Sequence, residues 1–305
     1  HDGNYSNKFR TNGYYYTNRV KTTWKFHSLV TWKLSFQVIQ YSISSLKSDF
    51  NELNIEVRLQ RVKFMRKEPF TVGNFVHIYN RGNRKLSIVR DESDKCYFIH
   101  ALYYFNTEIT PENPFQSLRE SGVSLKSDFN ELNLIWPEDW QPRKPIVKIL
   151  AYILLENHFH LVLKEIKDGG VTTLMRRIGT GMTNRFNTKY KETGRLFQGA
   201  YKAKCLDNDN YLKYILVYIQ IKNAFEMFPG GVKKAIENFD LAYNWAIKYS
   251  YNSLSNYANT GNTQIIDKDI IKDFFPKPND FKEFAKECMF NLDLENELKG
   301  LTFEN

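Results

Sequence analysis

Two histidines separated by one residue, His158 and His160, are the side chains in this chain best placed to do chemistry together. They lie in the stretch Ala151–Leu163, where two apolar runs flank the polar pair Glu156-Asn157. This pattern predicts a β-hairpin, and alternation along its second strand turns both imidazoles to one face. Two neighbouring imidazoles can hold one divalent cation. For an isolated pair, two hydrogen-bonded structural histidines would be the better interpretation.

Tyrosines on a downstream helix are candidate nucleophiles. Asp207 or Asn208 can cap a helix from residue 209 to about 222, whose apolar stripe repeats at helical spacing. Tyr214 and Tyr218 lie on the flank of that stripe, as does Lys222. Tyrosines in such positions usually form the edge of a core.

A basic segment precedes that helix. Between residues 176 and 204 there are eight basic side chains and one acidic side chain, Glu192. Such a segment can contact phosphates, while an exposed aromatic stacks on bases. A solvated helix face is the alternative. The candidate phosphate contacts are Arg176, Arg177, Arg185, Arg195, Lys202 and Lys204, with the aromatic Tyr201 among them.

Composition agrees with an anionic partner. The chain has 305 residues, a net charge of +9 and 42% apolar residues, which suffices for a sizeable core. Its three cysteines are odd in number and lack metal-like spacing, which indicates a reducing compartment such as the cytoplasm. No apolar run is long enough to span a membrane, and we expect none to do so.

Residues 1–64 differ in composition from the rest of the chain. They hold ten basic and four acidic residues without a sustained period, which favours a poorly ordered basic extension. The ten residues 45–54 recur without change as 124–133. Because the two copies have not diverged in sequence, they suggest a duplicated DNA segment. We therefore expect the native start of the protein near Met65. The second copy falls in residues 107–146, which we interpret as an insertion.

The remaining pattern alternates strands and helices. We expect strands at 75–80, 147–155, 158–164 and 196–206, and helices from a Ser93 cap to about 106, from Thr172 or Thr173 to about 190, and at 232–249, 267–275 and 281–289.

Four motifs, in this order and spacing, resemble one known family. They are NRGN at 80–83, ENHFH at 156–160, GRLFQGAYKA at 194–203 and DNDNYLKYILVYIQIKN at 207–223. Together they resemble the REP-associated tyrosine transposases, in the single-tyrosine branch of the HUH endonucleases. The match covers about Met65 to Phe225.

The resemblance implies an α+β fold, a ferredoxin-like sandwich whose antiparallel sheet carries helices on one face. Residues 65–228 would form this nuclease domain, and 229–305 a C-terminal helical extension. His158 and His160 match the family's metal ligands for Mg²⁺ or Mn²⁺, and Tyr218 matches its nucleophile. The family has an asparagine four residues after the tyrosine. Here that position is Lys222, so Asn223 and Gln220 are the candidate third ligands, and Lys222 a candidate phosphate contact.

The implied activity is cleavage and rejoining of single-stranded or hairpin DNA through a 5′-phosphotyrosine, with Tyr214 as the alternative nucleophile. We expect a cytoplasmic, nucleoid-associated protein, either a monomer or a homodimer. The first alternative is a hairpin-binding protein of the same fold that has lost cleavage, because Lys222 replaces the family's asparagine and Ala200 a basic residue. Further alternatives are a metal-dependent phosphoesterase that uses water and a protein whose histidines and tyrosines are structural.

Overall fold

The computed structural model describes residues 70–122 and 134–291. The basic extension 1–64 and both copies of the ten-residue repeat lie outside these residues, so the expectations for them stay predictions. Residues 69–305 group into one compact unit, which is the unit described below.

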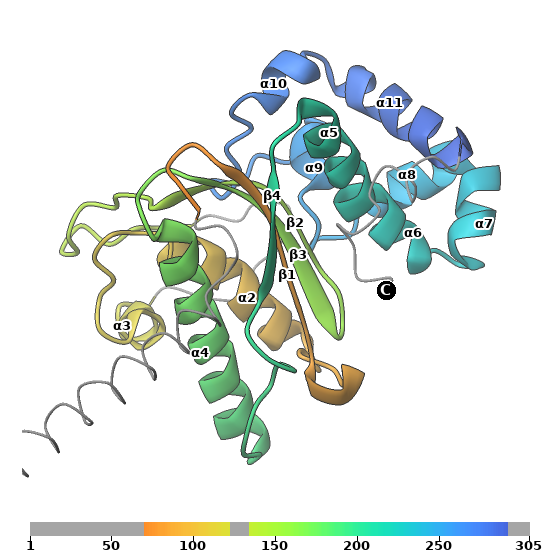
Figure 1. Cartoon of the computed structure of the whole chain (residues 1–305). Helices are drawn as coiled ribbons and strands as arrows, with labels where there is room; N and C mark the ends of the chain where they lie inside the picture. Colours follow the sequence, from red (N-terminus) through yellow and green to blue (C-terminus); the bar gives the residue numbers. More distant parts are fainter. Residues whose placement is uncertain (1–69, 123–133, 292–305) are drawn as a thin grey trace, which may run out of the picture. The chain divides into compact units, whose positions relative to one another are not determined.

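The first half of this unit holds the four strands and three helices, in the order strand, two helices, two strands, helix, strand, and helices follow in the second half (Figure 1). In chain order they are β1 (Phe75–Arg81), α2 (Glu92–Tyr104), α3 (Pro114–Glu120), β2 (Val147–Leu154), β3 (His158–Glu165), α4 (Gly170–Tyr190), β4 (Lys202–Leu206), α5 (Asp209–Val217), a π-turn (Tyr218–Lys222), α6 (Asn223–Glu226), α7 (Gly231–Glu237), α8 (Phe239–Ile247), α9 (Leu254–Tyr257), α10 (Ile271–Phe274) and α11 (Pro278–Asn291).

The four strands form one antiparallel sheet in the order β2-β3-β1-β4. β3 lies between β1 and β2, so the connection through α2 joins two strands that are not neighbours. The connection through α4 likewise joins β3 to β4 across β1. The expected α+β class is therefore confirmed. The central hairpin is confirmed as well, since β2 and β3 are separated only by residues 155–157.

Several element boundaries differ from the sequence expectation for local reasons. The N-cap of α2 is Asp91, whose side chain accepts a hydrogen bond from the Asp94 N–H, and not Ser93. Helix α4 begins before both threonines, because Gly169 takes a left-handed conformation with φ of 69° and starts the first turn.

Two expected elements are shorter than predicted. The strand expected from 196 is regular only from Lys202, and Phe197 forms a single bridge to Gly82. The helix expected at 232–249 is interrupted at Asn238, whose φ of −124° and ψ of 48° are not helical. Where helices were expected at 267–275 and 281–289, the structure has α10 and α11.

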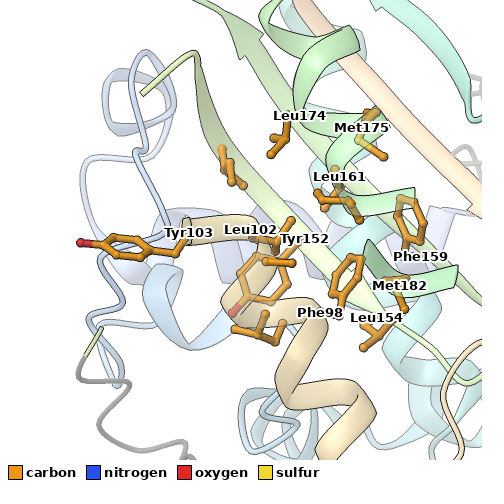
Figure 2. Close-up of a cluster of buried hydrophobic side chains, with 14 of the residues drawn as sticks. Phe98, Leu102, Tyr103, Tyr152, Leu154, Phe159, Leu161, Leu174, Met175 and Met182 are labelled. Carbon is orange, nitrogen blue, oxygen red and sulfur yellow. The ribbon is translucent and has the colours of Figure 1, made fainter. Parts of the chain in front are cut away.

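One apolar core fills the space between the sheet and helices α2 and α4 (Figure 2). Phe159 belongs to this core, because side chains alternate along a strand and it points away from the two histidines that flank it. Its ring meets Phe98 of α2 at 5.1 Å and Phe197 at 5.9 Å between centroids. A side chain that is 1% exposed in such contacts stabilises the fold by about 3 kcal/mol.

A second core covers the opposite face of the sheet. It joins residues of β2 and β3 to α5, the π-turn, α6 and the helices beyond residue 229. The sheet is thus covered on both faces, not on one face as the resemblance implies. The reason is that Leu150, Ile153 and Val162 give the second face its own apolar side chains, which the C-terminal helices bury.

The segment between α9 and α10 is tied to the sheet by ion pairs. Asp269 accepts from Lys148 of β2 at 2.7 Å and from Lys164 of β3 at 2.8 Å. In α9, which precedes this segment, the hydroxyl of Tyr257 donates to the Leu150 carbonyl at 2.9 Å. These contacts hold the C-terminal helices against the face that carries the histidines.

Candidate functional site

His158 and His160 lie on the same sheet face, as predicted, and a third histidine joins them. His77 of β1 is bonded through Nε2 to Nδ1 of His160 at 2.9 Å, and both side chains are fully buried. The rings of His158 and His160 are 5.2 Å apart and nearly perpendicular. His158 Nδ1 is 2.6 Å from the Asn157 side-chain oxygen. Each imidazole of the predicted pair therefore has one ring nitrogen oriented by a neighbour.

Both imidazoles of the pair are neutral at pH 7. Burial, followed by repulsion from Arg81, lowers the pKa of His158 to about 4, although a hydrogen bond with the Asn223 side chain acts in the other direction. Burial lowers the pKa of His160 well below its ordinary value, and its histidine neighbours add to this effect. A neutral imidazole keeps the lone pair that a metal or an acid would use.

Tyr218 faces the histidines from the helical layer. Its ring packs edge-to-face on His160, with 5.5 Å between centroids, and the side chain is 4% exposed. Tyr218 is the first residue of the π-turn that follows α5. Single π-turns inside helices are rare and are frequent at functional sites.

Asn223 reaches the same place from the end of the π-turn. Its side-chain N–H donates to the Tyr218 carbonyl at 2.8 Å, and its side chain also bonds with His158. The other candidate ligand, Gln220, is fully buried but lies next to Tyr257 of α9. The structure brings Asn223 to His158 and places Gln220 beside Tyr257.

Cationic side chains surround this group. The Lys222 ammonium lies 5.2 Å from the centre of the Tyr218 ring and pairs with Glu226 at 2.7 Å. Arg81, which pairs with His158 in the β1–β3 register, contributes positive potential to both histidines. This potential favours an anion such as a phosphate beside Tyr218.

The second tyrosine of the helix points elsewhere. Tyr214 packs on Phe284 of α11, with 5.6 Å between ring centroids. Tyr211, one turn before it, is 36% exposed. Tyr218, in contrast, contacts His160 of the pair.

The predicted DNA contacts on α4 lie in the layer on the opposite face of the sheet. Arg177 donates to the carbonyls of Phe105, Thr107 and Glu108, which follow the end of α2. Arg185 bonds with Ser93, whereas Arg176 is exposed. All three arginines line a cleft of about 890 Å³ between α3 and α4.

The remaining candidate DNA contacts lie on both faces of the sheet. Lys202 and Lys204 of β4 are exposed and pair with Tyr79 and His77 of β1 in register. Because opposed residues in an antiparallel pair share a face, both lysines lie on the histidine side. Arg195 and Tyr201 line a cleft of about 660 Å³ beside α4.

Sequence reasoning missed four members of the site, His77, Tyr79, Arg81 and Glu226. The alternation of β1 could have placed the first three on one face, and the spacing of Lys222 and Glu226 is that of a helical ion pair. Nothing in the sequence, however, shows that β1 lies beside β3.

The described residues contain no group of three His, Cys, Asp or Glu side chains arranged to hold a metal ion. The structure instead offers two histidines and an amide. None of the helices within 70–122 and 134–291 combines the length and apolar character needed to cross a bilayer.

Known proteins include a distant structural relative of this chain. No protein-family model matches this chain, and no curated protein is similar to it. Among solved structures, it is similar to a REP-associated tyrosine transposase bound to a REP hairpin. The two share 13% sequence identity with a TM-score of 0.35, over 66% of this chain and 87% of the other. That similarity is distant.

Proposed function

We propose that this chain is a single-tyrosine transposase or endonuclease of the HUH type, acting on single-stranded or hairpin DNA. The observation that carries the proposal is one cluster built from two segments that lie far apart in the chain. His158 and His160 of β3, Tyr218 of the π-turn and Asn223 of α6 contact one another. The order of strands and helices, with β3 and β1 central, supports a ferredoxin-like sandwich.

The donor set fits a divalent cation. Two neutral imidazoles, each oriented through its other nitrogen, and the Asn223 amide oxygen would hold the ion. Mixed nitrogen and oxygen donors suit Mn²⁺ better than Mg²⁺, which prefers oxygen ligands. When bound, the ion supplies polarisation of a non-bridging phosphate oxygen.

The reaction that these residues support is a transesterification. The Tyr218 oxygen attacks the phosphorus, the bond from phosphorus to the 3′ oxygen breaks, and a 5′-phosphotyrosine forms. The phenol releases one proton and the leaving 3′ oxygen takes one up, so no net proton is consumed. Lys222, held by Glu226 beside the Tyr218 ring, would stabilise charge on the phosphate. Attack by a 3′ hydroxyl on the phosphotyrosine reverses the step and joins strands.

The surface around the site suits a nucleic-acid backbone. Lys202 and Lys204 extend the positive potential of Arg81 across the same sheet face to β4. Arg176 and Arg195 would contact DNA from the α4 side of the sheet, where both are exposed. Affinity for DNA should therefore fall steeply with salt concentration.

A covalent-trapping assay tests the proposal. The protein is mixed with Mn²⁺ and labelled single-stranded hairpin DNA from the flanks of its own gene, and the products are separated under denaturing conditions. We expect a labelled protein band that Tyr218→Phe and His158→Ala abolish. Tyr211→Phe, which alters an exposed tyrosine on the same helix, is the matched control and should keep the band. A band that persists in Tyr218→Phe would refute the assignment of the nucleophile.

One observation favours a second function, hairpin binding without cleavage. The Tyr218 side chain is 4% exposed, with Lys222 against its ring, so DNA can reach the phenol only after local movement. Under this alternative the wild type binds hairpin DNA, yields no covalent band on any flanking sequence, and binds equally well as Tyr218→Phe.

A further inference from the structure

The cleft of about 890 Å³ between α3 and α4 lies on the face of the sheet opposite to Tyr218 (Figure 1). Its volume is within the range of sites that hold small ligands and cofactors. The described residues that line the cleft include five basic side chains and no acidic side chain. The basic side chains are Arg119, Arg176, Arg177, Arg185 and Lys189.

Part of this positive charge is not balanced by the described residues. Lys189 pairs with Asp91 at 2.6 Å and with Asp94 at 2.7 Å. Arg177, in contrast, donates to three backbone carbonyls, which orient its guanidinium without neutralising the charge. Burial lowers the pKa of Arg177, and repulsion from its neighbour Arg176 adds to this effect. An anion bound in the cleft would offset that repulsion.

Aromatic side chains also line the cleft. The rings of Tyr97 and Phe115 lie 4.3 Å apart, and the Arg185 guanidinium lies 4.9 Å from the centre of the Tyr97 ring. Gly181 of α4 makes room for this arrangement, because a Cβ there would lie 2.7 Å from the Tyr97 hydroxyl. Burial raises the pKa of the Tyr97 phenol to about 12, whereas the positive charges of Arg185 and Arg119 act in the opposite direction.

An aromatic surface next to arginines suits one chemical class of ligand. Unpaired nucleobases stack on aromatic rings and on guanidinium planes, and arginine pairs with phosphate oxygens. Proteins that bind single strands combine these two features, stacking surfaces and positive charge along the backbone. The cleft therefore fits a nucleotide, whose base is flat and apolar and whose phosphate is anionic.

A second cleft on the other side of α4 continues this surface. It measures about 660 Å³, and Arg195 is among its lining residues. Arg176, Thr180 and Asn184 line both clefts. Because these three residues are spaced four apart, they form one ridge along α4 between the clefts. A strand held in the first cleft can cross this ridge towards Arg195, whereas a free mononucleotide would occupy one cleft only.

We infer that the cleft between α3 and α4 binds an unpaired nucleotide of a nucleic-acid strand. The base lies beside Tyr97 and Arg185, and the phosphates lie at the exposed Arg119 and Arg176. This site is on the opposite face of the sheet from Tyr218 and needs neither the tyrosine nor a cation. It therefore goes beyond the proposed function, which concerns cleavage at Tyr218.

Fluorescence anisotropy with a short labelled oligothymidylate, without added metal, tests the inference. Arg119→Gln removes a phosphate contact, and Gln116→Glu adds a carboxylate to the same wall of the cleft. Each should weaken binding by at least about fivefold. Lys233→Gln is the matched control, since it also lowers the net charge by one but changes an exposed residue of α7. It should weaken binding by less than about twofold.

The three variants change exposed side chains, so their melting temperatures should stay within about 3 °C of wild type. A probe that carries one iodouracil base, crosslinked by ultraviolet light and mapped by mass spectrometry, shows where the base lies. We expect crosslinks to the peptide that holds Tyr97 or to the peptide that holds Phe115. Arg119→Gln should reduce their yield, and Lys233→Gln should not.

The possible results separate the alternatives. The inference is overturned if Arg119→Gln and Lys233→Gln weaken binding equally, or if the crosslinks fall outside the cleft. Displacement of the probe by a polyglutamate peptide of equal charge would show that charge alone is recognised, and equal displacement by thymidine monophosphate would make a free nucleotide the ligand. A wild type that forms no covalent DNA adduct refutes the nuclease and leaves this comparison intact.

Discussion

Replacing Asp269 with asparagine should reduce stability in a pH-dependent way. Asp269 is buried enough to raise its pKa, but hydrogen bonds from Lys148 and Lys164 outweigh this and lower the pKa from 3.8 to about 2. The difference corresponds to about 2.4 kcal/mol of folding free energy at neutral pH. Since both lysines are partly exposed, we expect about 1 to 2 kcal/mol after screening by solvent.

The sign follows from the depressed pKa of the folded state. The contribution of Asp269 is complete above the unfolded pKa near 3.8 and is lost as the pH falls toward 2. Urea denaturation followed by circular dichroism should therefore show Asp269→Asn to be less stable than wild type at pH 7, with about half the difference left at pH 3. Asparagine keeps a side-chain oxygen for the Ile270 N–H and tolerates the φ of 43°.

The matched control is Asp267→Asn. Asp267 also pairs with Lys148, at 3.1 Å, but its side chain is 48% exposed. We expect a smaller loss of stability, below about 1 kcal/mol. The reasoning fails if the two variants lose equal stability at pH 7, or if the loss in Asp269→Asn is the same at pH 3 as at pH 7.

Three further perturbations have defined outcomes. Phe159→Ala should cost about 3 to 5 kcal/mol in urea denaturation, because it leaves a cavity in the first core; no loss would contradict that packing. Arg177→Ala should lower stability by about 1 to 3 kcal/mol and leave the salt dependence of DNA binding unchanged, since its guanidinium bonds to carbonyls. Lys202→Ala with Lys204→Ala should reduce the slope of log Kd against log salt by about 1 to 2 in filter binding, and an unchanged slope would exclude both lysines from the DNA surface.

The central hairpin could be predicted because its signals are local. A polar pair between two apolar runs marks the turn, and one residue between His158 and His160 fixes their common face. The same strand alternation holds in β1, yet His77 was not recognised as a neighbour of His160. Pairing of β1 with β3 joins residues 83 positions apart, and no short-range pattern specifies it.

The helix around Tyr218 shows a different limit. Its apolar stripe predicts a regular helix from residue 209 to 222, and the calculation of faces assumes 3.6 residues per turn throughout. The π-turn changes that period over one turn, so the position of Asn223 could not be derived from the sequence pattern. The hydrogen bonding of Arg177 could not be predicted either. Its guanidinium donates to carbonyls at the end of α2, which lies far earlier in the chain.

The sheet separates the two apolar cores, and this arrangement has a consequence for how the protein can change over generations. Phe115 and Leu118 of α3 belong to the core on the α2 and α4 side, whereas Tyr218 belongs to the core on the other side. Between them lies a single layer of strands held by backbone hydrogen bonds, which depend little on side-chain identity. Substitutions in the segment between α2 and β2 can therefore alter the packing on one face of the sheet without touching the side chains that surround Tyr218 on the other.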